Sequence, residues 1–344
     1  MTVQTLDRPA RKALSAYAKL NMALAGAIVV LAGISLIVPT AAGIASTNLF
    51  ALWGADRDLA TLILVEIRLP RAVLGCLVGA TLGLCGAALQ GLLRNPLAEP
   101  GLIGVSGGAA LGAVLVFYFA IGLGWSLAVP LGGVAGAVLA LVVLYVLAGS
   151  NPRVATIILA GVAINSFAGA LTSLALNFAP NPYAALEILF WLLGSLTDRS
   201  REHVLLVLPF MAVGWALVAS AARALDALTL GEDTATSLGF DPLRVKLRIV
   251  AGTGLAVGAA VSVTGVISFI GLIVPHLLRP FTNYQPGRLL LPSALAGAAL
   301  LTAADLIARS VPTSSELRIG VVTALIGAPF FLTLILKTRK RMPL

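Results

Sequence analysis

The chain has 344 residues, of which 59% are hydrophobic and only 11% are charged. Soluble domains carry roughly a quarter charged residues, so this composition excludes a soluble protein and indicates an integral membrane protein. The net charge of +9 would also suit nucleic-acid binding. However, the Lys and Arg residues lie at the ends of apolar segments, where membrane topology explains them better.

Ten apolar segments predict an all-α integral membrane fold. They are residues 20–38, 71–93, 99–119, 127–148, 154–178, 202–222, 244–264, 266–281, 289–309 and 317–336. The segment at 266–281 is short and contains Pro275, which predicts a distorted helix shielded by its neighbours. Residues 184–196 are too short to span and are expected to lie at the outer surface or to pack into it. This gives one transmembrane domain, 20–336, between cytoplasmic tails at 1–19 and 337–344.

The distribution of basic residues predicts the orientation of these helices. With a cytoplasmic N-terminus, sixteen of the 23 Lys and Arg residues fall inside and seven outside, which also makes the C-terminus cytoplasmic. Arg68, Arg71 and Arg309 all reach the outer face against this bias, which predicts a basic docking patch for an acidic surface. Asp305 is expected to pair with Arg309 four residues later, and Glu66 with Arg68 or Arg71.

The longest predicted cytoplasmic loop, 223–243, contains a short helix. Glu232 and Asp233 lie in its first turn, where acidic side chains favour the helix dipole, and Gly239 follows its end. Its apolar side joins no transmembrane segment and consists of Leu228, Leu230, Ala235 and Leu238. This pattern predicts a docking element for a cytoplasmic partner, with an ordinary surface loop as the alternative.

One motif suggests catalysis. Residues 104–107, GVSG, match the GxSG motif of intramembrane serine proteases, and His276 lies at a similar predicted depth to serve Ser106 as a base. The alternative interpretation is that the glycines allow close helix contact, while His276, beside Pro275, hydrogen-bonds a freed backbone carbonyl.

No pattern in the sequence supports nucleotide binding, a disulfide, a metal site or ion-coupled transport. No GxxxxGK[ST] loop is present, so the chain does not bind nucleotide phosphates as a P-loop ATPase. Cys76 and Cys85 are nine positions apart on one predicted helix, too far for a disulfide and without metal-ligand spacing. The acidic residues cluster at loops and helix ends, which disfavours an ion-coupled secondary transporter.

Six passages together resemble the FecCD-type permeases, the membrane subunits of importers for iron–siderophore complexes, haem and vitamin B12. They are RLPR at 68–71, NPLAEPGLIGVSGG at 95–108, ALTLGEDTATSLG at 227–239, ISFIGLIVPHLLRP at 267–280, TAADLIAR at 302–309 and IGVVTALIGAPFF at 319–331. The resemblance covers nearly the whole chain. It implies the type II ABC importer permease architecture, with ten helices and an inverted relation between helices 2–5 and 7–10.

The resemblance also implies the partners and the cargo. Two permease subunits, as a second copy or a paralogue, would surround a central path in the bacterial cytoplasmic membrane. Two ATPase subunits inside would bind ATP and Mg²⁺, and a substrate-binding protein would dock outside. The chain would contact membrane lipid and no nucleic acid, and would hold no cofactor or metal of its own. The expected cargo is an iron(III)-siderophore, with haem or cobalamin as alternatives, moved by alternating access.

The expected site residues match functional positions of this family. They are Glu232, Asp233, Ala235, Leu238 and Gly239 for ATPase coupling, Arg68, Arg71 and Arg309 for binding-protein docking, and Asn95, Pro96, Leu97, Val154 and Ala155 for the inner gate and translocation path. At the last two positions the vitamin B12 permease of the family has small hydroxyl residues instead.

Overall fold

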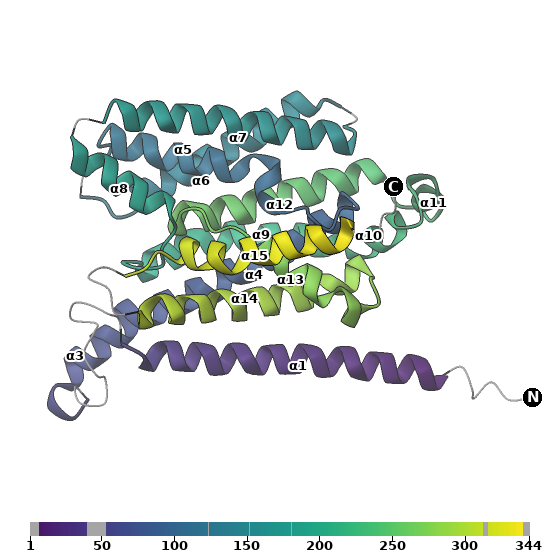
Figure 1. Cartoon of the computed structure of the whole chain (residues 1–344), viewed down its shortest axis with the longest axis horizontal. Helices are drawn as coiled ribbons and strands as arrows, with labels where there is room; N and C mark the ends of the chain where they lie inside the picture. Colours follow the sequence, from purple (N-terminus) through teal and green to yellow (C-terminus); the bar gives the residue numbers. More distant parts are fainter. Residues whose placement is uncertain are drawn as a thin grey trace, which may run out of the picture.

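The long helices of the protein lie side by side in one bundle (Figure 1). The structure is a computed structural model, and it describes residues 7–39, 53–122, 124–150, 152–179, 181–311 and 316–339. Within these ranges the regular structure is entirely helical, as the composition predicts. Seven helical stretches there are long and apolar enough to cross a membrane.

The helices fall into two length groups. The long ones are α1 (Asp7–Ile37), α4 (Leu69–Leu92), α6 (Ala128–Ala148), α7 (Val154–Asn177), α9 (Arg201–Ser220), α12 (Pro242–Thr264), α14 (Pro286–Ser310) and α15 (Ile319–Arg339). The short ones are α3 (Arg57–Leu62), η3 (Ile63–Arg68), η4 (Pro100–Ile103), α5 (Val105–Tyr118), α8 (Pro182–Leu192), α10 (Ala222–Leu228), α11 (Glu232–Ser237), α13 (Ile270–Leu278) and η5 (Arg279–Thr282).

Each of the ten predicted segments contains a helix, but two begin earlier than expected. Helix α1 starts at Asp7, inside the segment predicted as a tail. The second span is a continuous helical stretch from Arg57 to Leu92, because η3 is a π-helical turn that joins α3 to α4. Pro70 lacks an N–H and lies just after this turn, where the looser π geometry accommodates its ring.

Helices α4 and α12 form the interior of the bundle. In each, 78% of the apolar window is buried by the rest of the chain. Helix α4 packs along α14, α12 along α9, and α5 along α6. Glycines permit the close approach: a Cβ on Gly83 would lie 2.0 Å from the carbonyl oxygen of Ser293 on α14. Small residues therefore form the helix contacts, as expected where lipid removes the hydrophobic drive for association.

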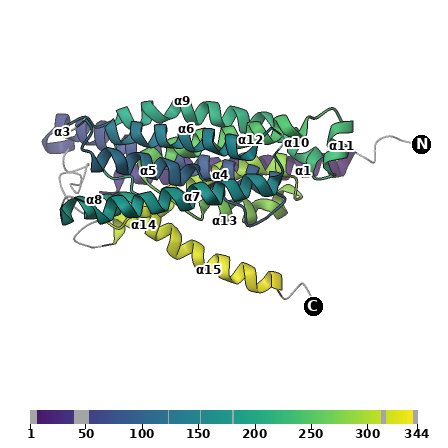
Figure 2. The same cartoon turned by 90° about the horizontal axis from the view of Figure 1, so that it is seen from above.

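The two ends of the bundle carry different elements. The start of α1, the end of α15, α10 and α11 lie at one end, which we call the α11 end, and α3 and α8 lie at the opposite α8 end (Figure 1). Helix α15 diverges from the bundle towards its C-terminus (Figure 2). This arrangement groups the start of α1 and the end of α15 with the loop 223–243, and the side of the membrane on which they lie stays a prediction.

One helix break, between α4 and α5, is closed by a side chain from α7. The chain turns through η4 before α5 begins at Val105, later than the predicted start at residue 99. The amide of Asn165 donates from Nδ2 to the Gly101 carbonyl oxygen at 2.6 Å and accepts at Oδ1 from the Gly107 N–H at 3.2 Å. Asn165 thus satisfies backbone groups that the irregular segment leaves without helical partners.

The distortion in α13 is resolved in a similar way. Pro275 has no N–H to donate to the carbonyl oxygen of Gly271, four residues earlier. Gln90 of α4 donates from Nε2 to the carbonyl oxygens of Gly271 at 3.4 Å and Leu272 at 3.2 Å. The expectation that His276 fills this role is wrong: within the described residues His276 Nδ1 has no hydrogen-bond partner, and its ring packs against Phe330.

Replacing Asn165 with leucine is expected to destabilise the protein by about 1–3 kcal/mol, because the Gly101 carbonyl and the Gly107 N–H lose their partner inside the bundle. The free energy of unfolding in mixed detergent micelles measures the effect. Asn177→Leu is the matched control, since Asn177 is exposed on the same helix. Equal stability of the two variants would contradict the role given to Asn165.

Candidate functional site

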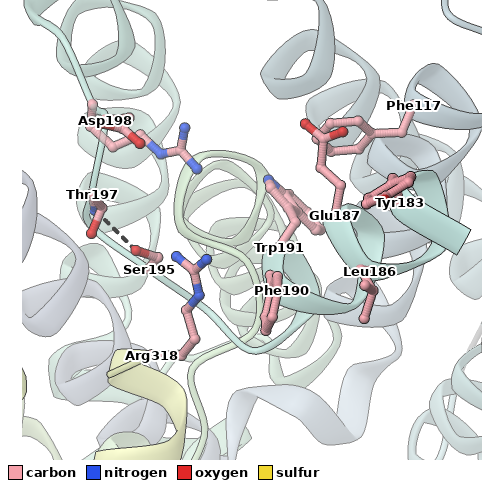
Figure 3. Close-up of a pocket in the computed structure, with 11 residues that line it drawn as sticks. Phe117, Tyr183, Leu186, Glu187, Phe190, Trp191, Ser195, Thr197, Asp198 and Arg318 are labelled. Carbon is pink, nitrogen blue, oxygen red and sulfur yellow. Dashed lines mark hydrogen bonds between the residues drawn. The ribbon is translucent and has the colours of Figure 1, made fainter. Parts of the chain in front are cut away.

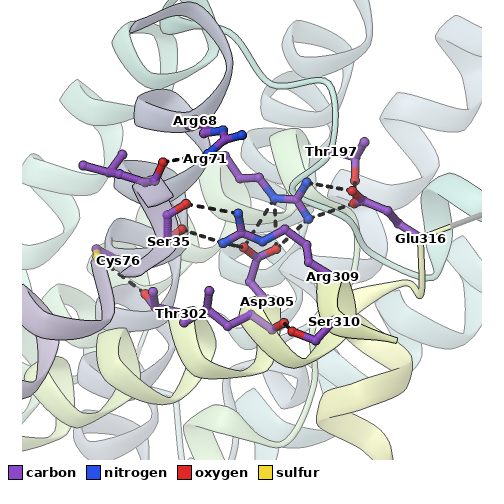
Figure 4. A network of polar contacts seen from close by, with 12 residues as sticks. Ser35, Arg68, Arg71, Cys76, Thr197, Thr302, Asp305, Arg309, Ser310 and Glu316 are labelled. Atoms are coloured by element: carbon purple, nitrogen blue, oxygen red, sulfur yellow. Dashed lines mark hydrogen bonds and ion pairs between the residues drawn. The ribbon is translucent and has the colours of Figure 1, made fainter. Parts of the chain in front are cut away.

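A buried network of charged side chains joins three elements at the α8 end (Figure 4). Arg71 of α4 forms ion pairs of 2.9 Å with Asp305 of α14 and with Glu316, which precedes α15. Asp305 also pairs with Arg309 at 2.9 Å, confirming the predicted ion pair within one helix. Because burial makes each unpaired charge costly, the network locks α4, α14 and the start of α15 together.

Neighbouring polar groups complete this network. Burial alone would raise the pKa of Glu316, but hydrogen bonds and the charge of Arg71, with a hydrogen bond from Thr197 at 2.8 Å, lower it below its usual value. Glu316 is therefore ionised at neutral pH. Arg309 donates to the hydroxyl of Ser35 at 2.6 Å and to the Ser35 carbonyl oxygen at 3.2 Å, which ties in α1.

Arg68 stabilises the end of α1. It donates to the carbonyl oxygens of Leu36 at 3.0 Å and Ile37 at 2.7 Å, which lack helical partners at a C-terminus. Glu66, expected to pair with Arg68 or Arg71, forms an exposed ion pair with Arg201 at 3.4 Å. The guanidinium groups thus have structural partners inside the protein.

The predicted exposed patch is not present in this structure. Arg68, Arg71 and Arg309 are only 1%, 5% and 3% exposed, so a partner at the α8 end does not reach their charges directly. The sequence separation of 245 residues between Arg71 and Glu316 explains why the sequence does not reveal this pairing. Their role in docking stays a prediction.

The coupling residues lie on α10 and α11. Ala235 is fully buried, and Glu232 pairs with the buried Lys246 of α12 at 2.9 Å. Leu230 and Leu238 are instead 67% and 59% exposed. The predicted apolar side is therefore divided: Leu228 and Ala235 attach the loop to the bundle, while the two exposed leucines face away from it.

Two glycines mark the start and the end of the short helix in this loop. Gly231 and Gly239 adopt φ of +115° and +87°, which L-residues rarely adopt, at the two ends of α11. Asp233 is exposed in the first turn, where it favours the helix dipole. A short, rigidly bounded helix thus projects from the bundle at the α11 end.

The predicted gate residues lie in two segments near the break before α5. Asn95 accepts a hydrogen bond from the Leu97 N–H at 2.9 Å, forming a local turn in which Asn95 and Pro96 are exposed. Val154 and Ala155 begin α7, which packs on η4 so closely that a Cβ on Gly161 would lie 2.0 Å from the Leu102 carbonyl oxygen.

Arg94 connects this turn to the coupling loop. Its guanidinium donates to the carbonyl oxygen of Leu228 at the end of α10, and its own backbone is left-handed at φ +49°. In the sequence Arg94 is only one of the predicted inside charges, because its partner lies 134 residues away. One hydrogen bond therefore links the end of α10 to the segment that holds Asn95 to Leu97.

Ser106 and His276 do not form a catalytic pair. No hydrogen bond joins them in the described part of the chain. The glycines of this segment serve packing instead: a Cβ on Gly107 would lie 2.4 Å from Asn165 of α7, and one on the adjacent Gly108 would lie 2.4 Å from Ala140 of α6. The packing part of the alternative interpretation is therefore confirmed, whereas its assignment of His276 to a freed carbonyl is wrong.

Comparison with known proteins decides the family. The model of the FecCD transport family matches residues 21–337. The chain belongs to the FecCD transport family. This FecCD permease is 43% identical over 286 residues to the cobalamin import system permease protein BtuC of Halobacterium salinarum, covering 81% of this chain and 74% of that protein. It is 36% identical over 308 residues to the hemin transport system permease protein HmuU of Yersinia pestis, covering 87% and 91%.

A solved structure shares the fold of the FecCD permease. It is described as an inward-facing conformation of a putative metal-chelate type ABC transporter, and it superimposes with a TM-score of 0.80 at 29% identity, over 93% of this chain and 99% of that one. The likeness supports about ten membrane helices. Proteins of this family are transport subunits rather than enzymes, so the serine protease hypothesis is wrong.

Replacing Asp305 with asparagine is expected to destabilise the permease by about 3–5 kcal/mol, because Arg309 then loses its carboxylate partner inside the protein and Arg71 keeps only Glu316. Detergent-induced unfolding monitors the change. The matched control is Glu66→Gln, which removes the exposed pair with Arg201 and is expected to cost about 1 kcal/mol or less. If Glu66→Gln lowers the stability as much as Asp305→Asn does, the buried network contributes no more to stability than an exposed ion pair.

Proposed function

We propose that this protein is the permease subunit of an ATP-driven importer that moves a metal chelate across the bacterial cytoplasmic membrane. An iron(III)-siderophore is the preferred cargo, with haem and cobalamin as the alternatives. Residues 20–336 form the single transmembrane domain, with both termini in the cytoplasm. The names of the relatives, which refer to cobalamin and hemin, support the chelate class.

The observation that carries this proposal is the exposure of two leucines on the coupling loop. Leu230 and Leu238 are exposed at the α11 end, on a loop that Ala235 and the Glu232–Lys246 ion pair hold against the bundle. Large apolar side chains presented outside the membrane segments on a fixed short helix are typical of a protein-binding surface. An ATPase subunit, which would supply ATP and Mg²⁺ binding, is the proposed partner.

The residues exposed on α7 support the proposal of a second permease subunit and of a path that the two subunits share. From Ala163 onwards small and polar residues recur along this helix at helical spacing, namely Ala163, Ser166, Ala170, Ser173 and Asn177, while Leu159, Phe167 and Leu174 are exposed beside them. Such a stripe is poorly suited to lipid and suits either an aqueous path or close contact with another helix. The path would begin at the α8 end, where a binding protein delivers cargo, and would close near Asn95 to Leu97, Val154 and Ala155.

The α11 end then transmits the state of the ATPase to the gate. Movement of α11 displaces α10, whose Leu228 carbonyl oxygen is bonded to Arg94 beside Asn95. The exchange between outward-open and inward-open states is therefore a rearrangement of packed helices, with no covalent step in this chain. Selection of the cargo is shared with the separate binding protein.

Replacing Leu238 with aspartate is expected to abolish ATPase association while the permease still folds, because the residue is exposed and buries no core contact. Co-purification of the ATPase from native membranes, identified by its P-loop peptide, and substrate uptake by the same cells are the measurements. Asn283→Asp is the control, since it adds the same charge on an exposed turn outside the coupling loop. Unchanged association and uptake in Leu238→Asp would refute the coupling role.

A further inference from the structure

An open pocket lies at the α8 end, between α8 and the segments that precede α9 and α15 (Figure 3). It has a volume of about 440 Å³, within the range of small-molecule sites. One wall is aromatic, with Tyr183, Phe190 and Trp191 of α8 and Phe117 of α5. The pocket adjoins the buried network of Arg71 through Thr197, which lines the pocket and donates to Glu316, and it contains no residue of the coupling loop.

The other wall carries two arginines. Arg318 lies with its guanidinium carbon 5.1 Å from the ring centre of Phe190, and Arg199 lines the same pocket. Neither arginine forms an ion pair among the described residues. A cation–π contact holds Arg318 over the aromatic wall while leaving its N–H groups available for an oxyanion.

Arg199 is under-satisfied in this pocket. Its Nε is buried and has no hydrogen-bond partner in the described part of the chain. Burial lowers the pKa of Arg199, Asp198 beside it raises the pKa, and the nearby charge of Arg318 lowers it further. A buried guanidinium donor without an acceptor is costly, and a bound anion would supply that acceptor and offset the repulsion between the two arginines.

The carboxylates of the pocket do not fill this role. Glu187 lies on the α8 wall beside Tyr183 and Phe117, across the pocket from Arg318 (Figure 3). Asp198 is exposed, with its backbone in the left-handed region at φ +57°. The pocket therefore pairs a basic wall with an aromatic wall, which together suit a ligand with a negatively charged group and a flat or apolar body.

We propose that this pocket is a receiving site for an anionic chelate, in which Arg199 and Arg318 bind an oxyanion of the cargo and the α8 aromatics pack against its body. The inference rests on the proposed import function and narrows its cargo to anionic chelates. Its position at the α8 end, opposite the coupling loop, places it where cargo would enter (Figure 1). A single carboxylate from a docked protein would occupy only a small part of the volume, so the structure favours a small molecule.

The test compares two ferric chelates of similar size that differ in charge, a tris-catecholate of charge −3 and a neutral tris-hydroxamate. Retention of radioactive iron by the full-length permease in nanodiscs measures their binding. Wild-type protein is expected to bind the tris-catecholate at least tenfold more tightly. Arg199→Gln/Arg318→Gln is expected to lose this preference, whereas Arg201→Gln, which removes an exposed arginine at the same end, keeps it.

A conservative variant serves as the control that distinguishes lost binding from misfolding. Arg318→Lys keeps the charge and is expected to retain most of the preference, and free citrate is expected to compete with the tris-catecholate on wild-type protein. No charge preference in wild type, or an equal loss in Arg201→Gln, overturns the inference. Loss of binding-protein docking in the double variant with unchanged chelate affinity also overturns it, because the occupant is then a protein carboxylate.

Uptake by the complete ATP-driven complex in proteoliposomes separates this inference from the proposed function. Uptake of the neutral chelate with no charge preference in binding overturns the anionic pocket and leaves import intact. Arginine-dependent binding of the anion without ATP-driven uptake of either chelate supports the pocket and overturns the import function.

Discussion

A helix that is broken inside a bilayer leaves backbone N–H and C=O groups that water cannot reach, and the fold depends on their finding partners. Two amide side chains supply these partners. Asn165 of α7 bonds both sides of the break before α5, and Gln90 of α4 bonds the carbonyls around the distortion at Pro275. Gln90 Oε1 in turn accepts from Arg279 at 2.7 Å. The irregular segments can therefore persist beside the proposed path without exposing backbone to lipid.

The same principle organises the charged groups at the α8 end. Three arginines that a linear sequence places near the outer surface are held by Asp305, Glu316, Ser35 and the last carbonyls of α1. These partners come from α1, α14 and the segment before α15, so the network fixes how the helices meet. Arg199 and Arg318 at the same end form no ion pair among the described residues and instead line a pocket with an aromatic wall. Arginines at this end therefore fall into a set held by helix partners and a set that lines the proposed ligand pocket.

The α11 end carries the surface proposed for protein contact. Its short helix is anchored by Ala235 and by the Glu232–Lys246 pair, and it presents Leu230 and Leu238 outwards. Arg94 joins the loop to the proposed gate by one hydrogen bond to Leu228. An ATPase subunit that moves this loop would thus act on the proposed gate through the hydrogen bond between the Arg94 side chain and the Leu228 carbonyl oxygen. The two ends of the bundle are connected through α4, which carries both Arg71 and the residues that precede Arg94.

The sequence by itself determined the class of protein, the approximate limits of the helices, the short helices at both ends and the packing role of the glycines. These features follow from apolar length, charge position and small-residue spacing, which are local properties of a chain in a membrane. Only the tertiary structure decided which polar groups meet: Arg71 with Glu316, Gln90 with Gly271, Arg94 with Leu228. It also decided that the conspicuous arginines are buried and that two others line a pocket. The physical reason is that these pairings join residues far apart in the chain, whose approach is fixed by helix packing rather than by any local pattern.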